Sequence, residues 1–325
     1  MEPPFINSEK ITALLPMNEC IPVMEEMFRS LADGTVQQPL RSIMWLPDKS
    51  GLLGMMPGYA AGPAVMGIKV ISVFHANHDE GYPSHQGVVI LFDARHGEPL
   101  MIFDAGEITA IRTAAASAVA TKILANENAE TLAILGSGVQ AEKHIEAITL
   151  VRKIKQINIW SRTKKNAEQL ANETGNKYNI PVTARYTAKE AIENADIICT
   201  VTSSPQPVLQ GEWLKKGAHI NAVGASTAAT REIDTKALLR CSLFTDNYES
   251  LFNEAGDYLI PLKEGAVTKN FVKAELGEVI TGKKQGRINS DEITLYKSLG
   301  IAAEDIFSAW HIYNKQGKII TASLK

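Results

Sequence analysis

The sequence predicts an α/β protein of two domains, one built on a parallel sheet and one of the α+β type with a mainly antiparallel sheet. From residue 131 onward, short apolar strands alternate with helical segments, as in the βαβ units of parallel sheets. Between residues 41 and 104, strand-like segments follow one another without gaps long enough for a helix, which favours antiparallel pairing. The length of 325 residues also suits two domains.

The N-terminal part begins with a helical stretch over residues 7–31. Short segments rich in Ile, Val, Phe and Leu follow it, and Gly, Pro, Asp and His residues separate them. They predict strands at residues 41–46, 51–56, 67–74, 87–93 and 99–104.

A change of pattern marks the second domain. Residues 108–124 are Ala-rich and uninterrupted, which predicts a long helix. Beyond it we expect strands at 131–135, 156–160, 182–184, 197–202, 219–223 and 243–245, and helices at 140–151, 165–174, 188–194, 271–281 and 292–310. We place the first domain at residues 1–118, joined by a C-terminal helix at about 305–325 that folds back onto it, and the second at residues 119–304.

Composition excludes several classes of protein. The 33 Lys and Arg residues nearly balance the 36 Asp and Glu residues, so the chain lacks the basic footprint of a nucleic-acid binder. The apolar runs fall short of a membrane span, and the first residues do not resemble a secretory signal. Cys20, Cys199 and Cys241 are far apart, which argues against a disulfide framework and fits a reducing compartment. We therefore expect a cytoplasmic protein with no nucleic-acid or membrane partner.

A glycine motif follows the strand expected at 131–135. The sequence from Gly136 to Ala141 reads G-x-G-x-x-A and opens a helix, as in a Rossmann dinucleotide-binding domain. The first glycine makes a tight turn, the second lets the backbone approach a pyrophosphate, and the helix N-terminus faces the phosphates. The alternative is a glycine turn that binds nothing. The cofactor contacts expected here are Gly136, Ser137, Gly138, Val139 and Gln140.

The end of the second strand of this domain favours NADPH. An NAD site carries an acidic residue there for the ribose 2′-hydroxyl. This chain has Ser161, Arg162 and Thr163 instead, and a guanidinium with two hydroxyls suits a 2′-phosphate. NADH is the weaker alternative, and Arg162 could also be a solvated surface charge. Asn166, at the start of the next helix, is a further candidate contact.

Two later strand ends complete the cofactor prediction. Ligands of such sheets bind beyond the carboxyl ends of the strands. We therefore expect Thr202 and Ser203, and one strand later Val223 and Ser226, to line the nicotinamide side.

Seven segments, in order along most of the chain, carry a resemblance to a known family. They are Pro-Ser-His-Gln at 83–86, Ile-Thr-Ala-Ile-Arg-Thr-Ala-Ala at 108–115, Leu-Gly-Ser-Gly-Val-Gln-Ala at 135–141, Trp-Ser-Arg-Thr-Lys at 160–164, Gly-Ala-His-Ile-Asn-Ala-Val-Gly-Ala-Ser at 217–226, Ala-Glu-Leu-Gly-Glu-Val-Ile at 274–280 and Lys-Ser-Leu-Gly at 297–300. The chain resembles the ornithine cyclodeaminase/mu-crystallin family, and its ketimine reductase branch most closely. The resemblance implies a homodimer formed through the sheet of the first domain, and chemistry on cyclic imino acids or α-amino acids.

The resemblance also implies substrate and catalytic residues. The carboxylate-binding and catalytic positions fall on Arg41, Lys69 and Arg112, and Arg112 also reaches the cofactor. Lys69 lies in an otherwise apolar strand, and the planar fork of Arg112 suits a carboxylate. For each, a solvated face or a structural ion pair is the alternative. Further positions implied by the resemblance are a loop toward the cofactor at Ser84, His85 and Gln86, a cofactor contact at Ser298, and a substrate contact at Ser226. His85 would equally suit a packed core.

Two departures from the family pattern bear on the reaction. Cyclodeaminases of the family carry an aspartate where this chain has Ser226 and a glutamate where it has Gly54. Ring closure needs such groups as acid and base. We therefore expect NADPH-dependent reduction of the C=N bond of cyclic ketimine carboxylates: Δ1-piperideine-2-carboxylate to L-pipecolate and Δ1-pyrroline-2-carboxylate to L-proline. Lys69, directly or through a water, is the expected proton donor.

Other readings of the function stay open. The chain could be an ornithine cyclodeaminase, an alanine or opine-type amino-acid dehydrogenase, or a non-catalytic, crystallin-like protein that binds NADPH. We expect no metal site: His75, His78 and Asp79 are spaced for one, but they lie in a loop between strands and no third ligand is evident in the sequence.

Overall fold

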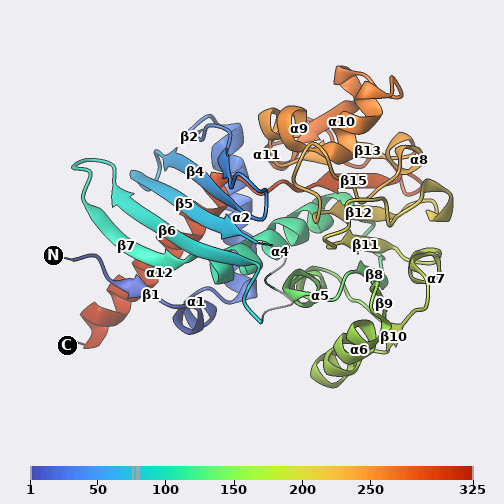
Figure 1. Cartoon of the computed structure of the whole chain (residues 1–325), viewed down its shortest axis with the longest axis horizontal. Coiled ribbons are helices and arrows are strands. Elements are labelled where there is room, and N and C mark those ends of the chain that lie inside the picture. The colour runs from blue at the N-terminus through green and yellow to red at the C-terminus, as the bar shows by residue number, and fades with distance from the viewer. Residues whose placement is uncertain (1, 75–76, 78–80, 324–325) are drawn as a thin grey trace. The chain divides into compact units, whose positions relative to one another are not determined.

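The computed structural model describes residues 2–74, 77 and 81–323. The chain divides into two compact units (Figure 1). The first unit consists of Met1–Arg112 with Ile301–Lys325, and the second of Thr113–Gly300. Each unit has its own sheet, and each is described below by itself.

The sheet of the first unit is largely antiparallel, as predicted. Its described strands are β1 (Phe5–Ile6), β2 (Val36–Gln37), β3 (Ser42–Trp45), β4 (Leu52–Ala60), β5 (Val65–Val73), β6 (His85–Asp93) and β7 (Pro99–Asp104). They run in the order β1-β7-β6-β5-β4-β2, with β3 paired to β4. Only β1 pairs in parallel among these described strands, with β7. Helices α1 (Ser8–Leu14) and α2 (Met17–Ala32) precede the sheet.

Helix α12 (Ala302–Ser323) covers one face of this sheet and also contacts α2 (Figure 1). Glycines let the helix come close. A Cβ at Gly58 would lie 2.8 Å from Ile306 Cδ1, and one at Gly67 would lie 2.9 Å from Ile306 Cγ1. Side chains of β4 and β5 that point to this face are therefore buried beneath a helix from the far end of the sequence.

Every strand pair of the second unit, all of whose residues are described, is parallel. The strand order is β10-β9-β8-β11-β12-β15-β13-β14. The first five strands follow the 3-2-1-4-5 order of a Rossmann sheet, and β15, the last strand in the sequence, takes the sixth place. The switch point of the sheet lies between β8 and β11. The strands are β8 (Thr131–Leu135), β9 (Gln156–Trp160), β10 (Val182–Ala184), β11 (Ile197–Thr200), β12 (His219–Ala222), β13 (Ser242–Thr245), β14 (Val272–Glu275) and β15 (Thr294–Lys297).

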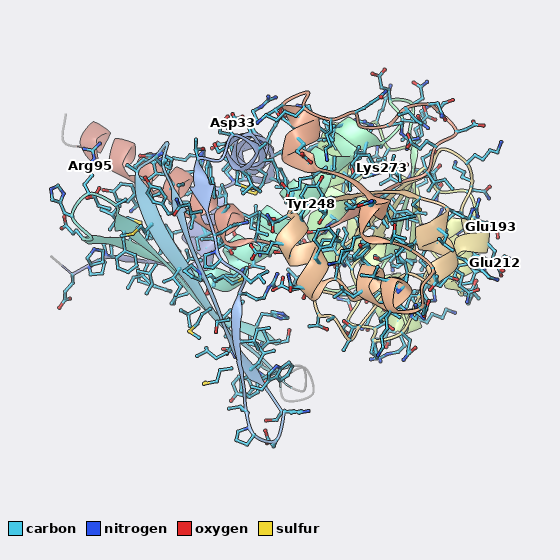
Figure 2. All side chains as sticks on the ribbon, turned by 90° about the horizontal axis from the view of Figure 1, so that it is seen from above. Asp33, Arg95, Glu193, Glu212, Tyr248 and Lys273 are labelled. Atoms are coloured by element: carbon cyan, nitrogen blue, oxygen red, sulfur yellow. The ribbon has the colours of Figure 1, made fainter. Side chains whose placement is uncertain are left out.

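Helices connect these strands. They are α4 (Ala105–Leu124), which begins in the first unit, α5 (Val139–Val151), α6 (Lys164–Tyr178), α7 (Ala188–Ile192), α8 (Thr235–Leu239), α9 (Tyr248–Glu254), α10 (Gly256–Lys263) and α11 (Leu276–Ile280), with short 3-10 turns at Gly211–Trp213 and Lys269–Phe271. Two apolar cores pack around β8 and β11, one of them against α5 and α6. Charged side chains such as Glu193 and Glu212, and Arg95 in the first unit, lie on the surface (Figure 2).

Two helix predictions near the C-terminus are wrong. Residues 292–310 contain strand β15 and only the start of α12. All four residues of β15 are buried in the sheet. A fully buried strand shows no alternation of polar and apolar residues, so its pattern resembles that of a buried helix. Residues 271–281 likewise begin with β14, and α11 takes only their second half. Among the helices in the described part of the chain, none is long and apolar enough to cross a membrane.

Candidate active site

The glycine motif forms a tight turn between β8 and α5. Gly136 has a φ of 129°, and a Cβ there would lie 2.7 Å from the carbonyl oxygen of Val201 on the neighbouring chain segment. Only glycine fits this position. Gly138 differs, since a Cβ there would meet no atom within 4 Å of the described structure. Gly138 caps α5, and Val139 beside it is 60% exposed. Open backbone at a helix N-terminus, at the switch point of a parallel sheet, fits a dinucleotide pyrophosphate.

The end of β9 lies next to this turn. The Ser137 hydroxyl donates a 2.8 Å hydrogen bond to Ser161 Oγ, which connects the glycine turn to the segment that carries Arg162. Arg162, Thr163 and Asn166 are exposed around the start of α6. A guanidinium here is free of burial and can turn toward a phosphate at the same sheet edge.

The remaining residues of the cofactor prediction also follow strand ends. Thr202 and Ser203 follow β11, Val223 and Ser226 follow β12, and Ser298 follows β15. Because these strands are parallel neighbours, their carboxyl ends share one edge of the sheet with the glycine turn. Ser298 is only 1% exposed.

In the first unit, Lys69 and Arg112 both form an ion pair with the carboxylate of Asp305. Lys69 Nζ lies 2.8 Å from Asp305 Oδ2, and Arg112 Nε donates to Asp305 Oδ1 at 3.0 Å. Arg112 also donates through a terminal nitrogen to Glu304 Oε2 at 2.5 Å. All four side chains are at most 4% exposed. We call these four residues the buried charge cluster; its two positive and two negative charges balance.

Burial and neighbours shift the pKa values in this cluster. Burial lowers the pKa of Lys69 to about 8, with Asp305 opposing the change and Arg112 adding to it. Burial alone would raise the pKa of Asp305, but the charges of Arg112 and Lys69 outweigh it and hold that pKa below its usual value. Lys69 is therefore a cation that gives up its proton at a pH close to neutral.

The first unit places the other predicted residues as follows. Arg41 is half-buried just before β3, and its charge is among those that lower the Lys69 pKa. Ser84 and His85 stand at the start of β6, where the Ser84 hydroxyl lies 2.9 Å from His85 Nδ1. Gln86 and His85 are exposed, so His85 is no core histidine.

Comparisons with known proteins show the family of this chain. Residues 1–318 match the model of the ornithine cyclodeaminase/mu-crystallin family. The chain belongs to this family. It is 38% identical to the ketimine reductase mu-crystallin of Mus musculus over 96% of this chain and 97% of that protein.

Two solved structures of relatives show the same fold. The Δ1-pyrroline-2-carboxylate reductase of Thermococcus litoralis, in complex with NADH and L-proline, is 36% identical, with a TM-score of 0.94 over 97% of this chain and 98% of that one. An archaeal alanine dehydrogenase dimer with bound NAD is 30% identical, with a TM-score of 0.93 over 98% of each chain. The family relationship predicted from the sequence motifs is therefore confirmed.

Sequence reasoning missed Glu304 and Asp305. The helix expected at 292–310 would put them mid-helix, whereas they lie in the first turn of α12, where the helix dipole favours carboxylates. Two adjacent acids among apolar residues, Ala-Ala-Glu-Asp-Ile-Phe at 302–307, were the available signal. Charged residues in such a setting are usually paired when buried.

Among the described residues, no group of three or more His, Cys, Asp or Glu side chains is placed so that it could hold a metal ion. His75, His78 and Asp79 lie outside the described residues.

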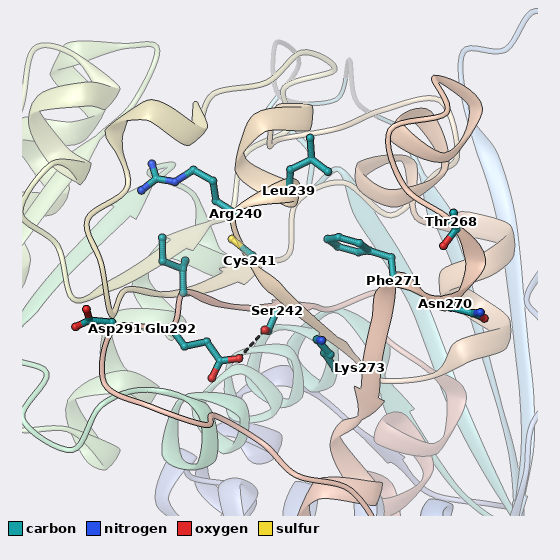
Figure 3. A pocket seen from close by; sticks show the side chains of 11 residues that line it. Leu239, Arg240, Cys241, Ser242, Thr268, Asn270, Phe271, Lys273, Asp291 and Glu292 are labelled. Atoms are coloured by element: carbon teal, nitrogen blue, oxygen red, sulfur yellow. Dashed lines mark hydrogen bonds between the residues drawn. The ribbon is translucent and has the colours of Figure 1, made fainter.

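A surface pocket at the other edge of the second unit's sheet is distinct from the cofactor edge. Figure 3 shows it at the amino ends of β13, β14 and β15, where the Ser242 hydroxyl donates a 2.5 Å hydrogen bond to Glu292. Arg240, at its rim, donates to the carbonyl oxygens of Gly211 and Leu214. Ligands of parallel sheets bind at the carboxyl ends, so this pocket carries no part of the site.

Proposed function

We propose that the protein is an NADPH-dependent reductase of cyclic ketimine carboxylates, which converts Δ1-piperideine-2-carboxylate to L-pipecolate and Δ1-pyrroline-2-carboxylate to L-proline. The observation that carries this proposal is the pair of buried cations, Lys69 and Arg112, held on Asp305. A cyclic imine reductase needs a cation to hold the substrate carboxylate and a proton for the imine nitrogen, and this pair provides both. The names of the reductase relatives agree with it.

Arg112, with Arg41 or Lys69, holds the substrate carboxylate. The contacts to Glu304 and Asp305 occupy Nε and one terminal nitrogen of Arg112, and fix the plane of its guanidinium. A guanidinium has five N–H donors, so donors remain for a bidentate partner.

Lys69 supplies the proton at Nζ, directly or through a water. A general acid works best when its pKa lies near the operating pH, and the Lys69 pKa of about 8 meets that condition. A nicotinamide coenzyme held at this site would supply the hydride for the imine carbon. Protonation of the imine nitrogen makes that carbon a better acceptor.

The glycine turn and the end of β9 hold the coenzyme. Gly136, Ser137, Gly138, Val139 and Gln140 take the pyrophosphate, and Ser161, Arg162, Thr163 and Asn166 take the ribose phosphate. The relatives with solved structures hold NADH or NAD. We propose NADPH for this chain because Arg162 stands at the ribose end, with NADH as the weaker coenzyme.

The absence of a carboxylate at position 54 favours reduction over ring closure. Gly54 pairs with Ile71 across β4 and β5, and Met56 pairs with Lys69, so Gly54 and Lys69 point to the same face. A Cβ at Gly54 would be in ordinary contact with Ile71, 3.5 Å away, so a larger residue could start there. The chain leaves this face without the carboxylate that the family's cyclodeaminases carry. Cyclodeamination and amino-acid dehydrogenation are the alternatives within the family.

We further propose that the first unit binds substrate and forms a homodimer. The row Pro57–Ile68–Ile90–Ile102 crosses the sheet on the face opposite Lys69, and its members are partly exposed and apolar. Exposed apolar faces of this kind mark protein interfaces. The alanine dehydrogenase relative is a dimer. We propose that residues 1–118 with 305–325 form the substrate domain and residues 119–304 the coenzyme domain; the two compact units, Met1–Arg112 with Ile301–Lys325 and Thr113–Gly300, support this proposal. The described cysteines are buried and unpaired, in keeping with a cytoplasmic location.

The test follows loss of NADPH absorbance with each of the two ketimines, with NADH in parallel. Rapid loss with NADPH and formation of L-pipecolate or L-proline is the expected result. Turnover of ornithine or alanine with neither ketimine reduced would move the assignment to a cyclodeaminase or a dehydrogenase. NADPH binding without any turnover would favour the non-catalytic, crystallin-like protein.

A further inference from the structure

A buried glutamate joins two strand ends of the second unit. Glu232 is 0% exposed. Its Oε1 accepts hydrogen bonds from the Thr202 backbone N–H at 2.7 Å and from the Thr202 hydroxyl at 2.6 Å. Its Oε2 accepts from the Gly224 backbone N–H at 2.6 Å and from the Thr200 hydroxyl at 2.8 Å. One carboxylate therefore bridges the segment after β11 and the segment after β12.

The two segments approach each other too closely for any residue but glycine at position 224. A Cβ at Gly224 would lie 2.1 Å from the Thr202 carbonyl oxygen and 2.6 Å from Glu232 Oε1. Real Cβ atoms do not reach such distances, so the spacing of these two segments is tight and specific. Both segments continue into residues that we assign to the nicotinamide side, Ser203 after Thr202 and Ser226 after Gly224.

Two more buried charges hold Glu232 in place. Asp257 Oδ1 accepts from the backbone N–H groups of Glu232 and Ile233, at 2.7 and 3.1 Å. Lys297 Nζ lies 2.8 Å from Asp257 Oδ2 and donates to the carbonyl oxygens of Ala222 and Ala225. Asp257 and Lys297 are each 1% exposed. Asp257 on α10 and Lys297 on β15 therefore hold the Glu232 backbone in place.

We propose that Glu232 is a positioning residue for the nicotinamide end of the coenzyme site. It acts through the Thr202 and Gly224 backbones, which set the spacing of the two strand ends, and it touches neither coenzyme nor substrate. The inference rests on the proposed nicotinamide site. It concerns one half of the coenzyme only, since the glycine turn and Arg162 hold the other half from β8 and β9.

The hydrogen-bond pattern makes Glu232→Gln a sharp test. Each carboxylate oxygen of Glu232 accepts from one backbone N–H. An amide has only one oxygen, so whichever way Gln turns, its NH₂ group faces a backbone donor and one of the two bridges is lost. The volume of the side chain is unchanged, so packing is not disturbed.

The experiment measures binding by calorimetry with two ligands, NADPH and 2′-phospho-ADP-ribose, which lacks the nicotinamide. For Glu232→Gln we expect NADPH affinity to fall about tenfold and affinity for 2′-phospho-ADP-ribose to stay within about twofold. The kcat for Δ1-pyrroline-2-carboxylate should fall about tenfold or more at saturating NADPH, since hydride transfer depends on position. An equal loss of affinity for both ligands, or no loss of affinity for either, would overturn the proposal.

Asp196→Asn is the matched control. Asp196 precedes β11, at the end of that strand opposite the cofactor edge. Its carboxylate accepts hydrogen bonds from the backbone N–H groups of Glu130 and Thr131, at the start of β8. Its replacement should leave the ratio of the two affinities unchanged. If Glu232→Gln does not fold, Thr200→Val keeps both backbone bridges and removes one hydroxyl; a selective loss of NADPH affinity of about two- to threefold is expected, and no selective loss would overturn the proposal.

Failure of the proposed function gives a different result. A wild-type protein that binds NADPH but reduces no ketimine still tests Glu232 through the ratio of affinities. A wild-type protein that binds neither NADPH nor NADH overturns both.

Discussion

Lys69 Nζ lies 2.8 Å from Asp305 Oδ2, so a strand near the start of the chain and the last helix meet at a buried ion pair. The same carboxylate accepts from Arg112 Nε through its other oxygen. Asp305 thus sets both the position of the arginine and the proton affinity of the lysine. Without it, two cations would stand buried with Glu304 as their remaining partner in the cluster.

The pH dependence of the reaction should report this pair. Lys69 must be protonated to act as an acid, so kcat/KM should fall as the pH rises through about 8, the Lys69 pKa. Asp305 raises that pKa, and its charge is lost in Asp305→Asn. The variant should therefore lose activity at a lower pH than the wild type. A profile of kcat/KM against pH, measured with Δ1-pyrroline-2-carboxylate, checks this. If the fall in kcat/KM occurred at the same pH in the variant and the wild type, the prediction would be contradicted.

Asp305→Asn should also unfold more easily. Removing one partner of a buried ion pair costs about 3–5 kcal/mol, because the other charge stays buried without compensation. The Asp305 pKa is depressed in the folded state, so its contribution to the free energy of unfolding is present above the usual carboxyl pKa and is lost as the pH falls through the folded value. Urea unfolding at neutral and acidic pH should show the wild type and the variant converging at low pH.

Lys69→Met should remove most of the turnover. General acid catalysis contributes about 10²- to 10⁴-fold, and methionine keeps the length of the side chain without its proton. Stopped-flow or steady-state loss of NADPH absorbance measures the effect at neutral pH. The control is Lys49→Met, an exposed lysine of the same unit, which should keep wild-type rates. Full turnover in Lys69→Met would show that another group donates the proton.

The two glycines of the cofactor turn should respond differently to alanine. Gly138→Ala places its Cβ in open space, so the midpoint of thermal unfolding should not move, while the methyl group occupies the approach of the pyrophosphate and weakens NADPH binding about tenfold or more. Gly136→Ala forces a φ of 129° and a contact with Val201, and should destabilise the fold. Thermal unfolding and NADPH titration separate the two effects. Unchanged NADPH affinity in Gly138→Ala would contradict the binding role.

Arg162→Ala should change coenzyme preference rather than activity. A charge-assisted hydrogen bond contributes about 1.5–3 kcal/mol, so the KM for NADPH should rise about tenfold to a hundredfold while the KM for NADH stays nearly constant. Lys165→Ala is the matched control, because Lys165 is an exposed cation in the first turn of α6, just after the segment that carries Arg162. If the KM values for NADPH and NADH rise together, the guanidinium does not recognise the 2′-phosphate.

Much of the fold could be predicted because its patterns are local. The strands at 99–104, 131–135, 156–160 and 182–184 coincide with β7, β8, β9 and β10, since turn residues and apolar runs mark both their ends. Strand β15 could not be found that way. It is buried throughout and inserts between β12 and β13, and that position follows from long-range pairing.

The site divides along the same line. The glycine turn is a contiguous motif, and its backbone geometry follows from its residues. Lys69 and Arg112 could be named, but their partners could not, because an ion pair between a strand and a helix far along the chain leaves no local pattern. Glu232 is a similar case, since its four donors come from the end of β11, the segment after it and the segment after β12, which only the parallel sheet brings together.

A charge on the outer face of the first sheet should separate the proposed dimer. Ile68 lies opposite Pro57 and Ile90 in a partly exposed apolar row, while its neighbour Lys69 points to the other face beneath α12. Ile68→Glu would bury an unpaired carboxylate in a two-fold interface, once from each copy, and such a charge costs several kcal/mol. Light scattering coupled to gel filtration should show the mass falling from twice 35.4 kDa to that of one chain. Arg95→Glu, an exposed change in the same unit, should keep the wild-type mass. A dimer that survives Ile68→Glu would place the interface on another surface.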